Sequence, residues 1–287
     1  MDITSIMLLK KDILKQVYPK RKFNARKYDY GALLIIGGSE KYSGSPAFNA
    51  LAALAAYRSG ADIVEVIAPR RSAGIIATFS PDIITIPLEG EYVSKKHLKT
   101  LFEETKNKTA VVIGGGIERE KDTQKTIIKY LKKINLPVVI DADAIYALAN
   151  EKSIIKSNFV ITPHAHEFFI LTGINLEEFT VNQKIAAVRD SALKLKCTIL
   201  LKGNPDIISN GKQNAINKTG NRFMTVGGTG DTLAGICGSL LAQGINPFKA
   251  ACAAAYINGK AGDVAAKKKK QSMLASDLIQ AISDVIA

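Results

Sequence analysis

The sequence has no tryptophan, only three histidines and only three cysteines among its 287 residues. The cysteines, Cys197, Cys237 and Cys252, lie far apart and form no Cys-x-x-Cys pair. This spacing argues against a disulfide framework and against a zinc site. Because each cysteine has apolar neighbours, we expect buried, unreactive thiols.

Long apolar runs are also missing. No window approaches the roughly 18 apolar residues of a membrane span. Residues 1–26 combine a short apolar patch with many lysines, unlike the long apolar region and small-residue cleavage site of a signal peptide. We therefore expect a cytoplasmic protein with no membrane partner.

The composition is that of an ordinary globular protein with excess positive charge. Hydrophobic residues make up 47% of the chain, and 39 Lys and Arg against 26 Asp and Glu give a net charge of +13. Such charge suits a partner that is nucleic acid or a polyanionic small molecule. Aromatic residues make up only 7% and form no stacking platform, so we expect no nucleic-acid partner. The run Lys267–Lys270 is predicted to be a solvated loop between two helices, with phosphate steering as the alternative.

Apolar, β-branched runs of strand length alternate with helical patterns, which predicts a mostly parallel central sheet flanked by helices on both faces. The Asn210-Gly211 pair predicts a hairpin turn. No linker or repeat divides the chain, so we predict a single α/β domain over residues 28–287, preceded by an N-terminal arm or helix over residues 1–27. Strands are predicted at residues 32–36, 62–67, 83–87, 110–113, 137–140, 159–161 and 198–201, and helices at 46–58, 94–104, 121–133, 144–150, 182–195, 229–243, 247–266 and 276–286.

The strongest local motif is the glycine cluster over residues 226–235, which opens directly into a helical pattern. The backbone N–H groups of Gly228, Thr229 and Gly230 would be free at a helix N-terminus, where the helix dipole favours an anion. Asp231 stands beside this anion hole and could take a proton from a hydroxyl that attacks a phosphoryl group. The alternative is a simple helix cap by Thr229 or Asp231.

The cluster fits neither of the common nucleotide-binding motifs. The sequence contains no Gly-x-x-x-x-Gly-Lys-[Ser/Thr], and the glycine spacing does not match the dinucleotide fingerprint. A different phosphate chemistry is indicated.

Together with four further segments, this cluster resembles the ADP/ATP-dependent NAD(P)H-hydrate dehydratase family of the ribokinase-like superfamily. The resemblance runs from about Gly31 to the Ser276-Asp277-Leu278 helix start. The further segments are Ile35-Ile36-Gly37-Gly38-Ser39 with Tyr42-Ser43-Gly44-Ser45-Pro46, Val112-Ile113-Gly114-Gly115-Gly116, Asp141-Ala142-Asp143-Ala144 and Thr162-Pro163-His164-x-x-Glu167.

The resemblance implies a ribokinase-like fold and a lyase that repairs hydrated NADH and NADPH. ADP or ATP, with Mg²⁺, would phosphorylate the hydroxyl of the hydrated nicotinamide ring, and phosphate would then leave. Phosphate is a far better leaving group than hydroxide, so the phosphoryl transfer lowers the barrier to elimination. A separate NAD(P)H-hydrate epimerase is an expected functional partner, and a homo-oligomer is expected.

Most predicted substrate contacts follow strands, where open α/β sheets bind ligands. Three departures from the family pattern accompany them: Ser45 replaces the usual Ala, Gly115 replaces Pro, and Ala165-His166 replaces Pro-Gly, which makes His166 a rival to His164. Packing glycines, helix capping by Asp143 and a structural histidine remain the alternatives. The substrate contacts that the resemblance implies are Gly38, Tyr42, Ser45, Gly114, Gly116, Asp141, His164 and Asp231.

The nucleotide site is predicted at the end of the last strong strand. A lysine there can meet a phosphate as a point charge, and a plain turn is the alternative. Arg222 could add a cation, and Glu167 is a candidate ligand for magnesium or water. The nucleotide contacts that the resemblance implies are Lys202, Gly203, Asn204, Pro205, Asp206 and Gly230.

Two other functions stay open at this stage. A ribokinase-like kinase of a vitamin-precursor alcohol would accumulate a phosphorylated product, whereas the dehydratase would release inorganic phosphate. A basic nucleic-acid-binding protein would keep its binding at physiological salt. The sequence does not decide between ADP and ATP as the donor.

Overall fold

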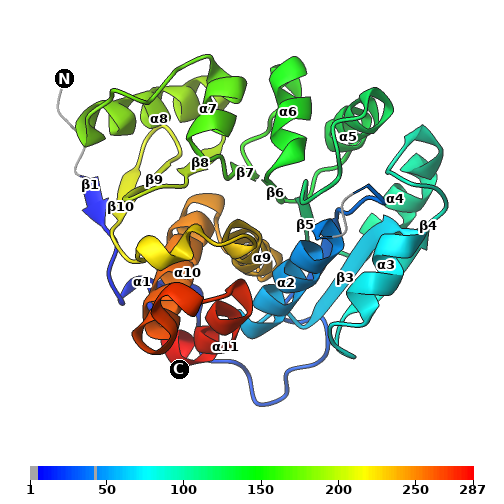
Figure 1. The fold of residues 1–287 in the computed structure, drawn as a ribbon, viewed down its shortest axis with the longest axis horizontal. Coiled ribbons are helices and arrows are strands. Elements are labelled where there is room, and N and C mark those ends of the chain that lie inside the picture. The colour runs from blue at the N-terminus through cyan, green and yellow to red at the C-terminus, as the bar shows by residue number, and fades with distance from the viewer. Residues whose placement is uncertain (1–5, 42–43) are drawn as a thin grey trace.

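The computed structural model describes residues 6–41 and 44–287. In these ranges a ten-stranded sheet runs through the molecule in the order β1-β10-β9-β8-β7-β6-β5-β2-β3-β4 (Figure 1). The strands are β1 (Ile6–Leu8), β2 (Ala32–Ile36), β3 (Ile63–Pro69), β4 (Ile84–Leu88), β5 (Ala110–Ile113), β6 (Val138–Ile140), β7 (Phe159–Ile161), β8 (Thr198–Leu201), β9 (Asp206–Ser209) and β10 (Asn214–Asn217).

Helices cover both faces of the sheet, as Figure 1 shows. One face carries α1 (Ile13–Val17), α2 (Ser45–Arg58), α3 (Arg70–Ala77), α9 (Thr229–Ala242), α10 (Pro247–Lys269) and α11 (Ala275–Ile286). The other carries α4 (Leu98–Thr105), α5 (Lys121–Lys133), α6 (Asp143–Asn150), α7 (Ala165–Thr172) and α8 (Val181–Leu195). Short 3-10 turns are η1 (Lys95–His97), η2 (Lys152–Ile154), η3 (Arg222–Thr225) and η4 (Lys270–Ser272).

The central strands are buried on both faces. Within β2, Leu33 and Ile35 pack under α2 and α9, whereas Leu34 and Ile36 pack under the helices of the opposite face. This is the reason for the continuous apolar runs, since a strand covered on both sides has no solvent-facing positions. The predicted parallel sheet flanked by helices is therefore confirmed, and so is the single α/β architecture.

The strands run parallel except around β9, which is antiparallel to both of its neighbours, β8 and β10. The Asn210-Gly211 pair lies in the turn that joins β9 to β10, which confirms the predicted hairpin.

The chain order reverses between β2 and β5. From β2 the chain continues outward to β3 and β4, and it then returns to β5 on the other side of β2. Open α/β sheets bind ligands at the carboxyl edge beside such a reversal of strand order. The Gly37-Gly38 and Gly114–Gly116 segments follow β2 and β5 directly.

Helices α2 and α9 pack closely against each other beside the switch point, the place between β2 and β5 where the chain order reverses. A methyl group on Gly235 of α9 would lie 2.1 Å from the carbonyl oxygen of Ala52 on α2, so only glycine permits this approach. The small residues of both helices thus bring the N-terminus of α9 toward the two glycine loops.

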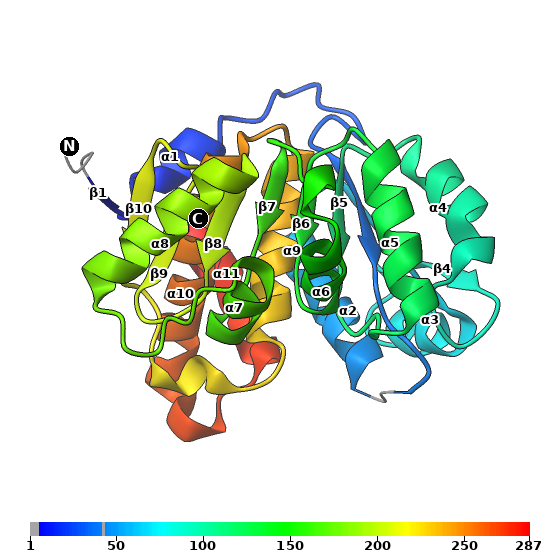
Figure 2. The ribbon, with the colours of Figure 1, turned by 90° about the horizontal axis from the view of Figure 1, so that it is seen from above.

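The segment predicted as an N-terminal arm or helix contains both a strand and a helix. Strand β1 pairs with β10 in parallel at the edge of the sheet (Figure 2). Helix α1 packs against α10 and buries Ile13, Leu14 and Val17 in the core. The segment is thus integrated with the sheet rather than detached from it.

The prediction of a loop at Lys267–Lys270 was wrong. The lysines continue the last turn of α10 into η4, and all four are exposed. Cations at a helix C-terminus interact favourably with its dipole, which explains why the run extends the helix. The three cysteines are buried and free, as expected, and burial raises the pKa of Cys197 to about 12. Among the described residues, no helix combines the length and apolarity needed to traverse a lipid bilayer.

Candidate active site

The glycine cluster forms the start of α9. Gly228 is the N-cap residue, with φ of +93°, and no side chain caps the helix. The Thr229 hydroxyl instead turns back to the carbonyl oxygens of Met224 (2.9 Å) and Val226 (3.2 Å). Because the first N–H groups of a helix lack intrahelical partners, this start of α9 is compatible with the anion hole at Gly228, Thr229 and Gly230, which stays a prediction.

Asp231, in the first turn of α9, faces the loop after β5. A methyl group on Gly115 would lie 3.1 Å from Asp231 Oδ1 and 3.1 Å from Asn49 Oδ1, which places both side chains against this loop. Burial, reinforced by Asp141 and Glu167, raises the pKa of Asp231 to about 7, although Lys202 and its own amide act in the opposite direction. A carboxylate with this pKa is well matched to general base catalysis near neutral pH.

The glycine loops on this side are held by tight backbone contacts. Gly38 N–H donates to Gly115 O (2.8 Å), and Ser45 Oγ donates to Gly116 O (3.0 Å). Gly114 has φ of +133°, and a methyl group there would lie 1.8 Å from Asp141 O. Ser45 is buried, so its hydroxyl braces the loop. Tyr42, also a predicted substrate contact, lies outside the described residues.

Asp141 directly follows β6, and it contacts Lys202, which directly follows β8. It accepts hydrogen bonds from Thr162 Oγ1 (2.8 Å) and Lys202 Nζ (2.7 Å). Burial disfavours the charge on Lys202, but Asp141 and Glu167 outweigh it and raise the pKa of the ammonium group. Asp143, the predicted alternative cap, instead pairs with Arg119 at 2.7 Å.

His164 and Glu167 cap helix α7. His164 N–H donates to Glu167 Oε2 (2.8 Å), and Glu167 N–H donates to His164 Nδ1 (3.3 Å), which forms a capping box. The His164 side chain is half exposed and lines the large cavity described next. The His166 ring lies 6.3 Å from the His164 ring. His164 therefore combines a structural role with access to the cavity.

The large cavity lies between the end of β8, η3 and the start of α9. Its volume is about 630 Å³. Asp206 holds one of its loops in place, because its carboxylate accepts from Gly203 N–H (2.9 Å) and Asn217 Nδ2 (2.9 Å). The cavity collects these predicted site residues: His164, Lys202, Gly203, Asn204, Asp206, Gly228, Thr229 and Gly230, with Arg222. Pro205 faces a smaller neighbouring pocket.

Two asparagines that the sequence analysis missed support this site. Asn49 Nδ2 donates to the carbonyl oxygens of Ser45 (3.0 Å) and Gly115 (2.9 Å). Asn258 Nδ2 donates to Thr229 O (3.2 Å), and its Oδ1 accepts from Thr232 Oγ1 (2.8 Å). Each is an amide within an alanine-rich, buried helix. A buried amide needs hydrogen-bond partners. A single asparagine among alanines in a buried helix was therefore the sequence signal that could have indicated these two residues.

The residues around Glu167 do not fit a bound magnesium ion. Glu167 already accepts from the His164 amide, and the Lys202 ammonium group lies 3.6 Å from the same oxygen. Within residues 6–41 and 44–287, no group of three His, Cys, Asp or Glu side chains is arranged to hold a metal. The prediction of Glu167 as a metal ligand therefore finds no support in the geometry.

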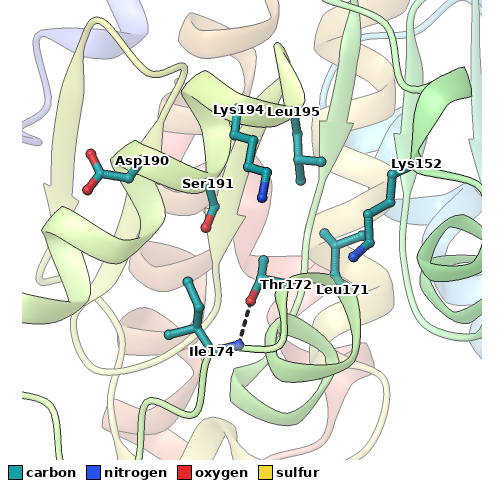
Figure 3. A pocket seen from close by; sticks show the side chains of 8 residues that line it. All are labelled: Lys152, Leu171, Thr172, Ile174, Asp190, Ser191, Lys194 and Leu195. Atoms are coloured by element: carbon teal, nitrogen blue, oxygen red, sulfur yellow. Dashed lines mark hydrogen bonds between the residues drawn. The ribbon is translucent and has the colours of Figure 1, made fainter.

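A second cavity, of about 160 Å³, lies between the end of α7 and α8. Figure 3 shows its side chains, with Lys152 and Lys194 reaching toward it and Ile174 N–H donating to Thr172 Oγ1 (3.1 Å). None of the predicted site residues in the described part of the chain lines it. The cavity that contains the glycine cluster is therefore the candidate active site.

A mostly parallel sheet with an anion hole and a carboxylate at its switch point defines a ribokinase-like α/β protein. Solved structures support this class. A ribokinase-like superfamily protein from Enterococcus faecalis superposes with a TM-score of 0.86 at 25% identity, covering 100% of this chain and 97% of that one. The ADP/ATP-dependent NAD(P)H-hydrate dehydratase from Bacillus subtilis, co-crystallised with ATP and Mg²⁺, superposes with a TM-score of 0.82 at 24% identity, covering 98% of each chain.

The model of the NAD(P)H-hydrate dehydratase family matches residues 33–284, and the chain belongs to this family. An ADP-dependent (S)-NAD(P)H-hydrate dehydratase from Nitrosopumilus maritimus is 36% identical over 281 residues, which cover 96% of this chain and 94% of that protein. The bifunctional NAD(P)H-hydrate repair enzyme Nnr from Pyrobaculum aerophilum is 40% identical over 268 residues, covering 93% of this chain and 52% of that protein. The chain thus spans about half the length of the bifunctional relatives. The resemblance noted from the motifs is confirmed.

Proposed function

We propose that this protein is a nucleotide-dependent NAD(P)H-hydrate dehydratase, a lyase that restores NADH and NADPH from their hydrates. The observation that carries the proposal is the position of Asp231. It lies in the first turn of α9 directly after Gly230, which lines the large cavity, and its carboxylate lies against the loop after β5. A nucleotide in the large cavity could therefore transfer a phosphoryl group to a hydroxyl group bound at the glycine loops, with Asp231 as the base.

The proposed chemistry has two steps. Asp231 takes the proton of the ring hydroxyl, whose oxygen attacks the terminal phosphoryl group, and the nucleotide leaves with one phosphate fewer. The ring carbon–oxygen bond then breaks, phosphate departs with the bonding electrons, and the adjacent ring carbon loses a proton to re-form the double bond. The N–H groups of Gly228, Thr229 and Gly230 stabilise the negative charge on the phosphoryl oxygens during transfer.

The nucleotide occupies the large cavity, where Lys202, Gly203, Asn204 and Asp206 line one wall. ADP is the proposed donor, because a relative that matches over nearly its full length carries that name. Any magnesium ion would be supplied together with the nucleotide rather than held by Glu167, since this ion is usually bound through one or two carboxylates and substrate phosphates. No step of the mechanism is assigned to it.

The hydrated cofactor occupies the other side of Asp231. Gly38, Ser45, Gly114 and Gly116 shape this wall through their backbone contacts. Asp141 and Tyr42 are further proposed contacts, and His164, which lines the large cavity, is proposed to reach the hydrate from the nucleotide side.

The test is incubation of the purified protein with hydrated NADH plus ADP, ATP or neither, followed at the absorbance band of reduced nicotinamide. Recovery should require a nucleotide and should be faster with ADP. Stoichiometric inorganic phosphate should appear. A phosphorylated product that accumulates without recovery of absorbance would favour a small-molecule kinase instead.

Three further proposals concern the cellular setting. The enzyme acts in the cytoplasm, works as a homo-oligomer and is paired with an NAD(P)H-hydrate epimerase activity. The bifunctional names of the longer relatives support the last of these. Light scattering tests the oligomer, and fractionation tests the location. A faster repair of mixed hydrate epimers after addition of an epimerase tests the pairing.

A further inference from the structure

Lys202 lies at the meeting point of three elements. Its ammonium nitrogen is 2.7 Å from Asp141 at the end of β6 and 3.6 Å from Glu167 on α7. A methyl group on Gly230 would lie 3.6 Å from the same nitrogen, so the ammonium group also lies against the first turn of α9. The side chain is only 20% exposed.

The two acidic partners are fixed by further hydrogen bonds. Asp141 Oδ1 also accepts from Thr162 Oγ1, and Glu167 Oε2 accepts from the His164 amide. Their side chains are 6% and 7% exposed. Two buried carboxylates side by side would repel one another, and a cation between them removes most of that cost.

Charged groups face Asp231 from several elements. The charges of Asp141 at the end of β6, Glu167 on α7 and Lys202 at the end of β8 act on the Asp231 carboxyl group, whereas α2 contributes the neutral Asn49. The His164 ring borders Glu167 at 3.3 Å. Lys202 is thus the cation that balances two carboxylates beside the base.

We propose that Lys202 is a positioning residue for Asp231: its ammonium group, held between Asp141 and Glu167 against Gly230, offsets their negative charge beside the base. The inference rests on the proposed function, in which Asp231 is the base. It differs from a role as a phosphate ligand, which would make nucleotide affinity the main contribution of this lysine.

The direction of the effect follows from charge alone. Removing a cation near a carboxyl group disfavours its ionised form and raises its pKa, and removing a nearby carboxylate lowers it. Lys202 lowers the pKa of Asp231, whereas Asp141 raises it. Loss of Lys202 and loss of Asp141 should therefore shift the activity in opposite directions along the pH axis.

The experiment compares Lys202→Met, Asp141→Asn and the double variant. The pH profile of kcat/KM for the hydrate is measured at saturating nucleotide, and the nucleotide KM is measured separately. The acid limb of the profile should move up by about one pH unit in Lys202→Met and down by about one unit in Asp141→Asn. The double variant loses one charge of each sign, so its acid limb should return close to that of the wild type.

Methionine preserves the length of the lysine side chain, but an unbalanced buried carboxylate could prevent folding. In that case Asp141→Asn and the double variant still test the role of Lys202, because both leave fewer buried carboxylates without a cation than Lys202→Met does. An upward shift in Lys202→Met supports the proposal whatever the nucleotide KM does. An acid limb that stays fixed in the folded variants overturns it, and a nucleotide KM raised tenfold would then assign Lys202 to phosphate.

Failure of this inference differs from failure of the proposed function. If the wild-type protein shows no nucleotide-dependent recovery of reduced nicotinamide, the proposed function is wrong. If the wild type is active but its variants keep the same acid limb, only the role of Lys202 is wrong.

Discussion

The two sides of Asp231 are held by different forces. On the side proposed for the hydrate (the hydrate side), the glycine loops after β2 and β5 are fixed by backbone contacts and by Ser45 and Asn49, and several of their glycines leave no room for a methyl group. On the nucleotide side, the loop after β8 is fixed by charged side chains, with Asp206 binding Gly203 and Asn217, and Lys202 binding Asp141. The hydrate side therefore depends on shape and the nucleotide side on charge, so steric substitutions should damage the first and pH should act on the second.

The largest expected effect is that of Gly114→Ala. The added methyl group would lie 1.8 Å from the Asp141 carbonyl oxygen, and the residue has a positive φ. We expect a loss of about 3 kcal/mol or more in the free energy of unfolding, measured by chemical denaturation. Gly74→Ala is the matched control, since nothing lies near that position within α3. Equal stability of the two variants would contradict the steric account.

On the nucleotide side, stability should depend on pH through Asp206. Burial raises the pKa of Asp206 from 3.8 to about 6. Between these values the folded protein retains a proton that the unfolded chain has released, so its stability falls as the pH rises. Relative to wild type, Asp206→Asn should therefore gain on the order of 2 kcal/mol between pH 4 and pH 6 and stay level above. A difference that is constant with pH would contradict this assignment.

The two asparagines offer a sharper and smaller test. Asn49→Ala should raise the KM for the hydrate about tenfold, because the Gly115 loop loses a donor. Asn258→Ala should raise the nucleotide KM by about the same factor, because Thr229 and Thr232 lose their partner. Steady-state kinetics with each substrate varied in turn measures both. If each variant changed both KM values equally, the two sides would not be independent.

The sequence predicted those parts of the fold that have a periodic or local signal. The strands from β2 to β8 were predicted close to their observed bounds, and the β9–β10 hairpin was predicted by its turn, because apolar runs and an Asn-Gly pair are local patterns. Helices α3 and α7 were missed, although α6 has the same length of eight residues and was predicted. Strand β1 was missed because three residues gain their structure only by pairing with β10.

Of the candidate site, the sequence likewise predicted the parts that have a local motif and missed the contacts between distant segments. The glycine cluster, Asp231 and the strand-end motifs are contiguous in sequence, and the family resemblance drew on them. The ion pairs of Lys202 with Asp141 and Glu167 join residues from three separate elements. The contacts of Asn49 with the loop after β5 are equally long-range. No local pattern encodes such contacts, since they exist only once the strands lie side by side.

The role of Asp231 as the base is tested most directly by the kcat of Asp231→Asn at pH 8, measured with hydrated NADH and saturating ADP. The amide keeps the shape of the side chain but cannot accept the proton, so kcat should fall by about 10² to 10⁴-fold while ADP affinity is retained. Asp190→Asn, an exposed substitution on α8, is the control and should keep full activity. An Asp231→Asn variant with kcat within threefold of the wild type would contradict the account.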